Sequence, residues 1–178
     1  MLTTTEKATH ERISDTIAKF IPQRADVVVL AIGSDRVTGD CIGPLVGYML
    51  SARGIPVYGG LRSPVTALNI LETCGIIAKR HPHAFIIAVD SAVGTDKEVG
   101  KIKVLPRGLR PAAAAGRKLP RVGHLSVIGV VSPERLGAKA LSEVRLGSVF
   151  ALARSIADGI EDALTAAKAR GGSFGIPF

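Results

Sequence analysis

Two short, almost wholly apolar runs constrain the fold of this chain more than any other feature. Residues 27–32 read VVVLAI, and residues 85–89 read FIIAV. Unbroken runs of β-branched and aliphatic residues, with no polar residue at alternate positions, are typical of strands buried on both faces of a parallel sheet. We therefore expect a parallel sheet whose two faces are both covered by helices.

Helical and strand patterns alternate over the first half of the chain, which is the order that builds parallel sheets. Helices are expected over residues 6–20, 44–53, 65–80, 133–141 and 144–169, and strands over residues 27–32, 56–59, 84–89, 100–105 and 125–131. This order predicts an α/β protein, a three-layer α/β/α sandwich with a mostly parallel sheet of about five strands. Residues 1–178 are expected to form a single domain, with an N-terminal helix in residues 1–22 and a loose tail in residues 171–178.

The composition narrows the classes of function. The net charge is +8, but aromatic residues make up only 4% of the chain and Trp is absent. Platforms for stacking bases are therefore scarce, and direct nucleic-acid binding is not expected. No apolar run approaches the ~20 residues that cross a bilayer, and the polar first residues do not resemble a secretory signal. We expect a cytoplasmic protein without membrane association, and homo-oligomerisation stays open.

Asp40 and Asp90 are the leading candidates for a functional site. Asp90 directly follows one apolar run, and Asp40 follows the other after a glycine-containing loop. If the second and third strands flank the first on opposite sides, a crevice opens between the first and third strands, where the loops that follow them meet. Two carboxylates in such a crevice can share a proton or hold a metal ion. The local alternatives are that Asp40 caps the next helix and that Asp90 organises a turn.

Other features provide weaker candidates. Cys41 would need a positioned histidine to act as a nucleophile, and His124, just before the fifth strand, is the histidine expected nearest to it. We interpret Cys41 as a packing residue. The glycines of residues 33–47 match neither common nucleotide-binding motif. Residues 100–133 contain no Asp or Glu. Within them Arg117, Lys118 and Arg121, here called the basic rim, either bind an acidic substrate or form a solvated face.

The loop after the first apolar run carries a recognisable motif. Residues 33–47 read GSDRVTGDCIGPLVG. This segment resembles the signature of the YyaC-type sporulation proteins, which are relatives of the germination protease of spore-forming bacteria. Residues 59–69, 88–94 and 119–131 support the resemblance by their order and spacing. The resemblance covers the chain from about residue 27 to residue 160.

The resemblance implies a hydrogenase-maturation-protease-like fold and a peptidase of spore formation or germination. The germination protease is a peptidase held to use two aspartates, which match Asp40 and Asp90 of this chain. It degrades small spore proteins that coat DNA. By this resemblance we expect protein or peptide substrates, small spore proteins among them, no cofactor, and a location in the forespore or spore interior.

Two alternatives stay open beside this interpretation. Hydrogenase maturation proteases look like more distant relatives, and they grip nickel with acidic residues and a histidine. By that comparison Asp40, Asp90 and His124 would bind a divalent metal ion. The other alternative is a non-enzymatic sporulation protein that binds acidic partners through the basic rim.

The basic rim generates a first testable prediction. Replacing Arg117, Lys118 and Arg121 together by Ser should weaken the binding of an acidic peptide and flatten its salt dependence. The reason is that attraction between exposed charges is screened over about 10 Å at 0.1 M salt. Titrating the peptide at low and at high salt measures both effects. An affinity that is unchanged at low salt would show that these side chains form only a solvated face.

Overall fold

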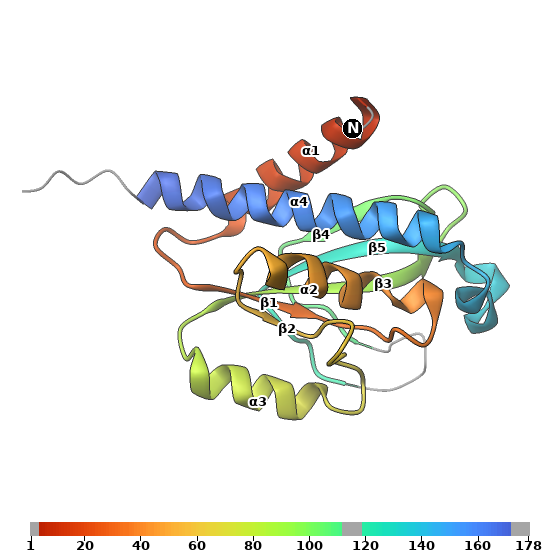
Figure 1. Cartoon of the computed structure of the whole chain (residues 1–178), viewed down its shortest axis with the longest axis horizontal. Helices are drawn as coiled ribbons and strands as arrows, with labels where there is room; N and C mark the ends of the chain where they lie inside the picture. Colours follow the sequence, from red (N-terminus) through yellow and green to blue (C-terminus); the bar gives the residue numbers. More distant parts are fainter. Residues whose placement is uncertain (1–3, 112–118, 172–178) are drawn as a thin grey trace, which may run out of the picture.

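A five-stranded sheet forms the centre of the molecule (Figure 1). The computed structural model describes residues 4–111 and 119–171. The strands are β1 (Val27–Ala31), β2 (Val57–Tyr58), β3 (Phe85–Gly94), β4 (Ile102–Leu105) and β5 (Leu125–Pro133), in the spatial order β2-β1-β3-β5-β4. Neighbouring strands are parallel except for β4, which pairs antiparallel with β5. The second and third strands flank the first on opposite sides, which is the condition under which a crevice between β1 and β3 is expected.

Helices cover both faces of this sheet, as the apolar runs predict. The helices α1 (Thr4–Phe20), α2 (Ile42–Ala52) and α4 (Leu146–Gly171) pack on one face, and α3 (Ile70–Arg80) packs on the other (Figure 1). The predicted α/β/α sandwich with a mostly parallel sheet is therefore confirmed. Among the described residues, no helix combines the length and the apolar character needed to span a membrane.

Successive residues of β1 point into two different cores. Val29 belongs to the core beneath α1, α2 and α4, whereas Val28 and Leu30 belong to the core beneath α3. All three are at least 99% buried. Burial of one such side chain stabilises the fold by roughly 1.5–3 kcal/mol. The unbroken apolar run at residues 27–32 therefore has a direct physical cause, because neither face of this strand meets water.

The strands end at different levels on the carboxyl edge of the sheet. Ala31, the last residue of β1, pairs with Val89, but β3 continues past this point to Gly94 while paired with β5. Asp90 lies inside β3, opposite Ile128 of β5. The expectation that this strand ends at Val89 is therefore wrong, and so is the local alternative that Asp90 organises a turn. Pairing with β5 keeps the backbone extended beyond the apolar run.

Two predicted helices differ from the structure by more than two residues. The helix expected from residue 65 begins at Ile70, because Val65 is held extended by a parallel bridge to Ile32 and the Asn69 side chain bonds the backbone of the intervening turn. The helix expected over residues 133–141 is replaced by the end of β5 and two short 3-10 helices, η3 (Glu134–Leu136) and η4 (Ala138–Ser142). The expected C-terminal tail lies outside the described residues apart from Gly171.

Candidate active site

Asp40 and Asp90 line the same cavity, which has a volume of about 590 Å³. The cavity extends from the carboxyl edge of the sheet over β3 and β5, where Ala92 and Ile128 also line it. As whole residues, both aspartates are partly exposed. The structure thus brings together the two acidic residues that the sequence singles out, although they are far apart along the chain.

The turn after β1 determines where Asp40 lies. At Gly33 the φ angle is 141°, and a Cβ atom there would lie 2.1 Å from the Asp40 carbonyl oxygen. Ser34 donates its N–H to that same oxygen over 3.1 Å. Asp40 itself is the last residue of the 3-10 helix η1 (Thr38–Asp40). Only glycine allows the chain to fold back this closely, so Gly33 sets the position of the acidic residue.

The Asp40 side chain does not cap α2. Cys41 is the N-cap residue of this helix, and no side-chain capping hydrogen bond is formed there. The Asp40 carboxylate instead accepts a hydrogen bond from the Ser91 hydroxyl, with 3.3 Å between Oγ and Oδ1. The carboxylate therefore turns towards β3 and the cavity rather than towards the helix terminus.

Ser91 connects the two carboxylates. Its hydroxyl contacts Asp40, and its backbone N–H donates to Asp90 Oδ1 over 2.8 Å. One residue of β3 thereby holds both acidic side chains in place. Sequence reasoning missed this residue, and the only signal for it was its position directly after Asp90.

Burial and mutual repulsion set the protonation of the pair. The pKa of Asp90 is raised well above its usual value, first by burial and second by the negative charge of Asp40. Burial also raises the pKa of Asp40, but hydrogen bonds from the Ser91 side chain and the Ser34 backbone oppose that shift. Asp90 therefore keeps its proton to higher pH than Asp40. As the pH rises, Asp40 loses its proton before Asp90 does.

Three arginines line the same cavity, namely Arg107, Arg110 and Arg121. The Arg121 guanidinium donates to the Gly108 carbonyl oxygen over 2.7 Å. Arg121 belongs to the predicted basic rim, whereas Arg117 and Lys118 lie outside the described residues. Sequence reasoning did not place Arg107 and Arg110 in the site, although both belong to the segment without acidic residues.

His124 does not lie with the two aspartates. It precedes β5, at the amino edge of this parallel strand, and its Nδ1 accepts the backbone N–H of Ile86 over 2.9 Å. Its ring stacks on Phe85, the first residue of β3, with 5.3 Å between the ring centroids. The metal site expected from Asp40, Asp90 and His124 is therefore wrong. Within the described ranges, no three His, Cys, Asp or Glu side chains converge so that they could hold a metal ion.

Cys41 is part of the core rather than of the cavity. Its side chain is buried in the cluster beneath α1, α2 and α4. Burial raises the pKa of its thiol, and the charges of Asp35 and Asp40 raise it further. The thiol therefore stays protonated at neutral pH, which makes it a poor nucleophile.

By its fold and cavity, the protein is an α/β/α sandwich with two neighbouring carboxyl groups. One lies on β3 and the other in the loop after β1. The chain belongs to the family described as "Protein of unknown function (DUF1256)", which matches residues 1–159. It is 35% identical over 162 residues to "Uncharacterized protein YyaC" of Bacillus subtilis (strain 168), covering 88% of this chain and 79% of that relative. The resemblance to the YyaC-type proteins is confirmed.

Among solved structures, the chain is similar to the NiFe hydrogenase maturation protease HybD from Thermococcus kodakarensis. The two share 15% sequence identity and a TM-score of 0.43. The similarity covers 80% of this chain and 97% of that one.

Replacing Asp90 by Asn should stabilise the folded protein at neutral pH. Because the pKa of Asp90 is higher in the folded than in the unfolded state, the stability that its proton confers is fully present at low pH and is lost as the pH rises through the folded pKa. Asn cannot ionise and removes that loss, so the gain should grow by about 1.4 kcal/mol for each pH unit between the two pKa values. Urea unfolding between pH 4 and pH 8 measures the gain.

Asp96→Asn is a control in which the pKa of the replaced carboxyl group is shifted in the opposite direction. The pKa of Asp96 is lowered, mainly by its hydrogen bond with Arg135, so this carboxylate stabilises the fold above its unfolded pKa and its replacement should never stabilise at neutral pH. A gain for Asp90→Asn that stays constant with pH would contradict the assignment of a raised pKa to Asp90.

Proposed function

We propose that this protein hydrolyses peptide bonds by activating a water molecule between Asp40 and Asp90. The observation that carries the proposal is the cavity itself, in which the charge of Asp40 helps to keep Asp90 protonated. Two carboxyl groups that retain one proton supply a general base and a general acid at one place. In line with the resemblance, we propose a role in spore formation or germination.

The protonation of the pair assigns a role to each residue. The Asp40 carboxylate accepts a proton from the water, whose oxygen attacks the carbonyl carbon, while Asp90 donates its proton to the carbonyl oxygen. In the second half, Asp40 gives its proton to the leaving nitrogen as the carbon–nitrogen bond breaks, and Asp90 regains its proton from the hydroxyl on the same carbon. Both residues return to their starting states. The Ser91 hydroxyl, hydrogen-bonded to Asp40, positions the base.

The arginines suggest which substrates are preferred. Arg107, Arg110 and Arg121 line the cavity beside Glu134 and the two aspartates. While Asp90 keeps its proton, the three cations exceed the two remaining carboxylates, and this excess of positive charge attracts acidic segments of a polypeptide. Small spore proteins of the kind that the germination protease degrades are the substrates we would test first.

The same arginines favour one other function, a binding protein without catalysis. In that case an acidic partner would occupy the cavity through Arg107, Arg110 and Arg121, and the aspartates would only shape its floor. The two functions differ in what the aspartates do. A binding protein would keep or improve its affinity for an acidic partner when either aspartate loses its charge, and it would cleave nothing.

The catalytic role of the aspartates gives a direct prediction. Asp40→Asn and Asp90→Asn should each abolish cleavage of a small spore protein while leaving the fold intact, because Asn keeps the shape of the side chain but cannot transfer the proton. Cleavage is followed by gel electrophoresis and mass spectrometry of the products, and circular dichroism checks the fold. Full activity of both Asn variants would overturn the mechanism.

Cys41→Ala is the matched control next to Asp40. It should retain most activity, because the thiol is buried and protonated. Adding a strong chelator to the wild type should also leave the rate unchanged, since the described residues do not place His124 or another third ligand with the aspartates. Loss of activity in Cys41→Ala at unchanged stability would move the nucleophile from water to the thiol.

A further inference from the structure

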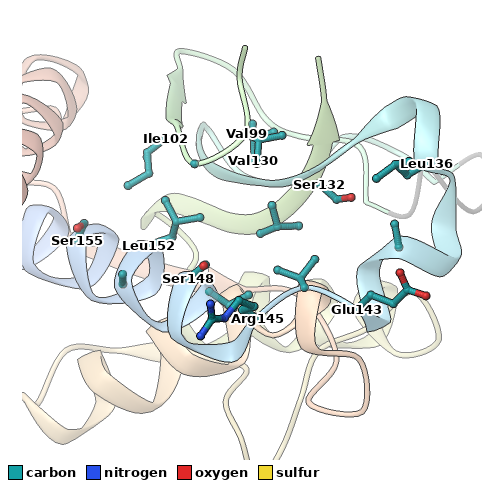
Figure 2. Close-up of a pocket in the computed structure, with 16 residues that line it drawn as sticks. Val99, Ile102, Val130, Ser132, Leu136, Glu143, Arg145, Ser148, Leu152 and Ser155 are labelled. Carbon is teal, nitrogen blue, oxygen red and sulfur yellow. The ribbon is translucent and has the colours of Figure 1, made fainter. Parts of the chain in front are cut away.

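A second hollow, lined mostly by apolar side chains, lies beside the candidate active site. This apolar groove has a volume of about 600 Å³ and runs between α4 and the edge of the sheet formed by β4 and β5. Figure 2 shows Ile102 of β4, Val130 of β5 and Leu152 of α4 around the same space. Nothing in the proposed mechanism uses this groove.

The groove and the aspartate cavity meet at a shared wall. The wall is residues 134–143, here called the dividing segment, which contains η3 and η4. Leu136 and Ala140 line the groove, whereas Gly137 and Leu141 line the aspartate cavity. Leu136 and Gly137 are consecutive and both exposed, so the crest between the two hollows is one residue wide.

The dividing segment also contacts the loop after β1, which carries Asp40. A Cβ atom on Gly39, the residue before Asp40, would lie 2.7 Å from the carbonyl oxygen of Leu141. The wall therefore stands directly against Gly39, the neighbour in sequence of the residue that carries the proposed base. A polypeptide that crosses this wall passes from the groove to Asp40 over a short path.

The chemistry of the groove differs from that of the cavity. The cavity is rich in charge, with three arginines beside Asp40, Asp90 and Glu134. The groove has one cation and one anion at its edge, Arg145 and Glu143 (Figure 2). Ser148 and Ser155 add hydroxyls that can bond a peptide backbone. Apolar surface, not charge, therefore selects what the groove holds.

We propose that the groove binds an apolar stretch of the polypeptide whose acidic stretch occupies the aspartate cavity. That this polypeptide is a substrate rests on the function proposed above. Its binding to the groove does not require cleavage. An extended chain advances about 3.3 Å per residue, so one or two residues cross the crest. A segment of roughly ten residues then fills both hollows.

Binding of designed peptides tests the proposal without any cleavage. The probe is a fluorescein-labelled peptide of about twelve residues with an acidic half and a leucine-rich half. Two versions are made, one with the acidic half at the N-terminus and one with it at the C-terminus. In the matched control peptide every leucine is replaced by alanine. Fluorescence anisotropy is measured with the Asp90→Asn protein, which cannot cleave the probe under the proposed mechanism. The leucine peptide should bind at least about tenfold more tightly than the alanine peptide, because several leucine side chains leave water.

Two variants on α4 locate the effect. Ala151 is exposed and lines the groove, so Ala151→Glu puts a charge into it and should abolish the preference for leucine. Ala166 is exposed on the same helix and lies outside the groove lining, so Ala166→Glu should leave the preference unchanged. The two substitutions are chemically identical, so a general effect of charge or helix stability would appear in both.

Photo-crosslinking tests whether one peptide spans both hollows. A photoreactive group at the leucine end should label residues of α4 near Leu152, and the same group at the acidic end should label residues 105–110. Equal binding of both peptides, a leucine preference that survives Ala151→Glu, or labelling of the groove by both ends would overturn the proposal. Spanning without cleavage would leave the groove assignment standing and refute only the peptidase, whereas cleavage without a leucine preference would refute only the groove.

Discussion

The parallel pairing of β1 with β3, buried on both faces, is the constraint on which the site depends. β1 stops at Ala31 opposite Val89, and the chain must then leave the sheet through the turn at Gly33. That turn returns the backbone over the end of β1 and places Asp40 next to the first residues of β3 that have no partner in β1. Asp90 is the first of these. The two carboxylates meet because one strand is shorter than its neighbour.

The two aspartates lower the stability of the folded protein when both are ionised, and the geometry of the site keeps them close together. Two carboxyl groups in one partly buried cavity repel each other when both are ionised, so burial and repulsion hold a proton on Asp90. Ser91 contacts both groups at once and limits how far they can move apart. A stretch of β3 that pairs with β5 rather than with β1 supplies this rigidity. Stability is thereby reduced where proton transfer would be useful.

The short 3-10 helices of the dividing segment explain how two chemically different hollows lie so close together. A regular helix over residues 133–141 would present one continuous face to each side. The two 3-10 turns, joined at Gly137, instead give neighbouring residues to opposite hollows. An arginine-lined cavity and an apolar groove then share one thin wall. The proposed binding of an extended polypeptide of mixed character uses both hollows.

Much of the site could be predicted because it follows from local patterns and strand direction. The apolar runs define the buried strands, the alternation of elements defines the parallel sheet, and the two aspartates follow from their positions after those runs. The parallel direction of β5 would also have excluded His124, because a residue that precedes a parallel strand lies at the amino edge. Excluding His124 from the site therefore required only the direction of β5 in the sheet.

The sequence by itself determined the sandwich and the choice of Asp40 and Asp90, since burial on two faces leaves a mark on every residue of a strand, whereas the order of the strands came from the structure. Only the tertiary structure decided that β3 runs past Asp90, that Ser91 bonds both carboxylates, and that Arg107 and Arg110 reach the cavity. These features arise from pairing and packing between segments distant in sequence. The pairing of β3 with β5 and the contact of Ser91 with Asp40 join segments that lie far apart in the sequence, so local composition does not predict them.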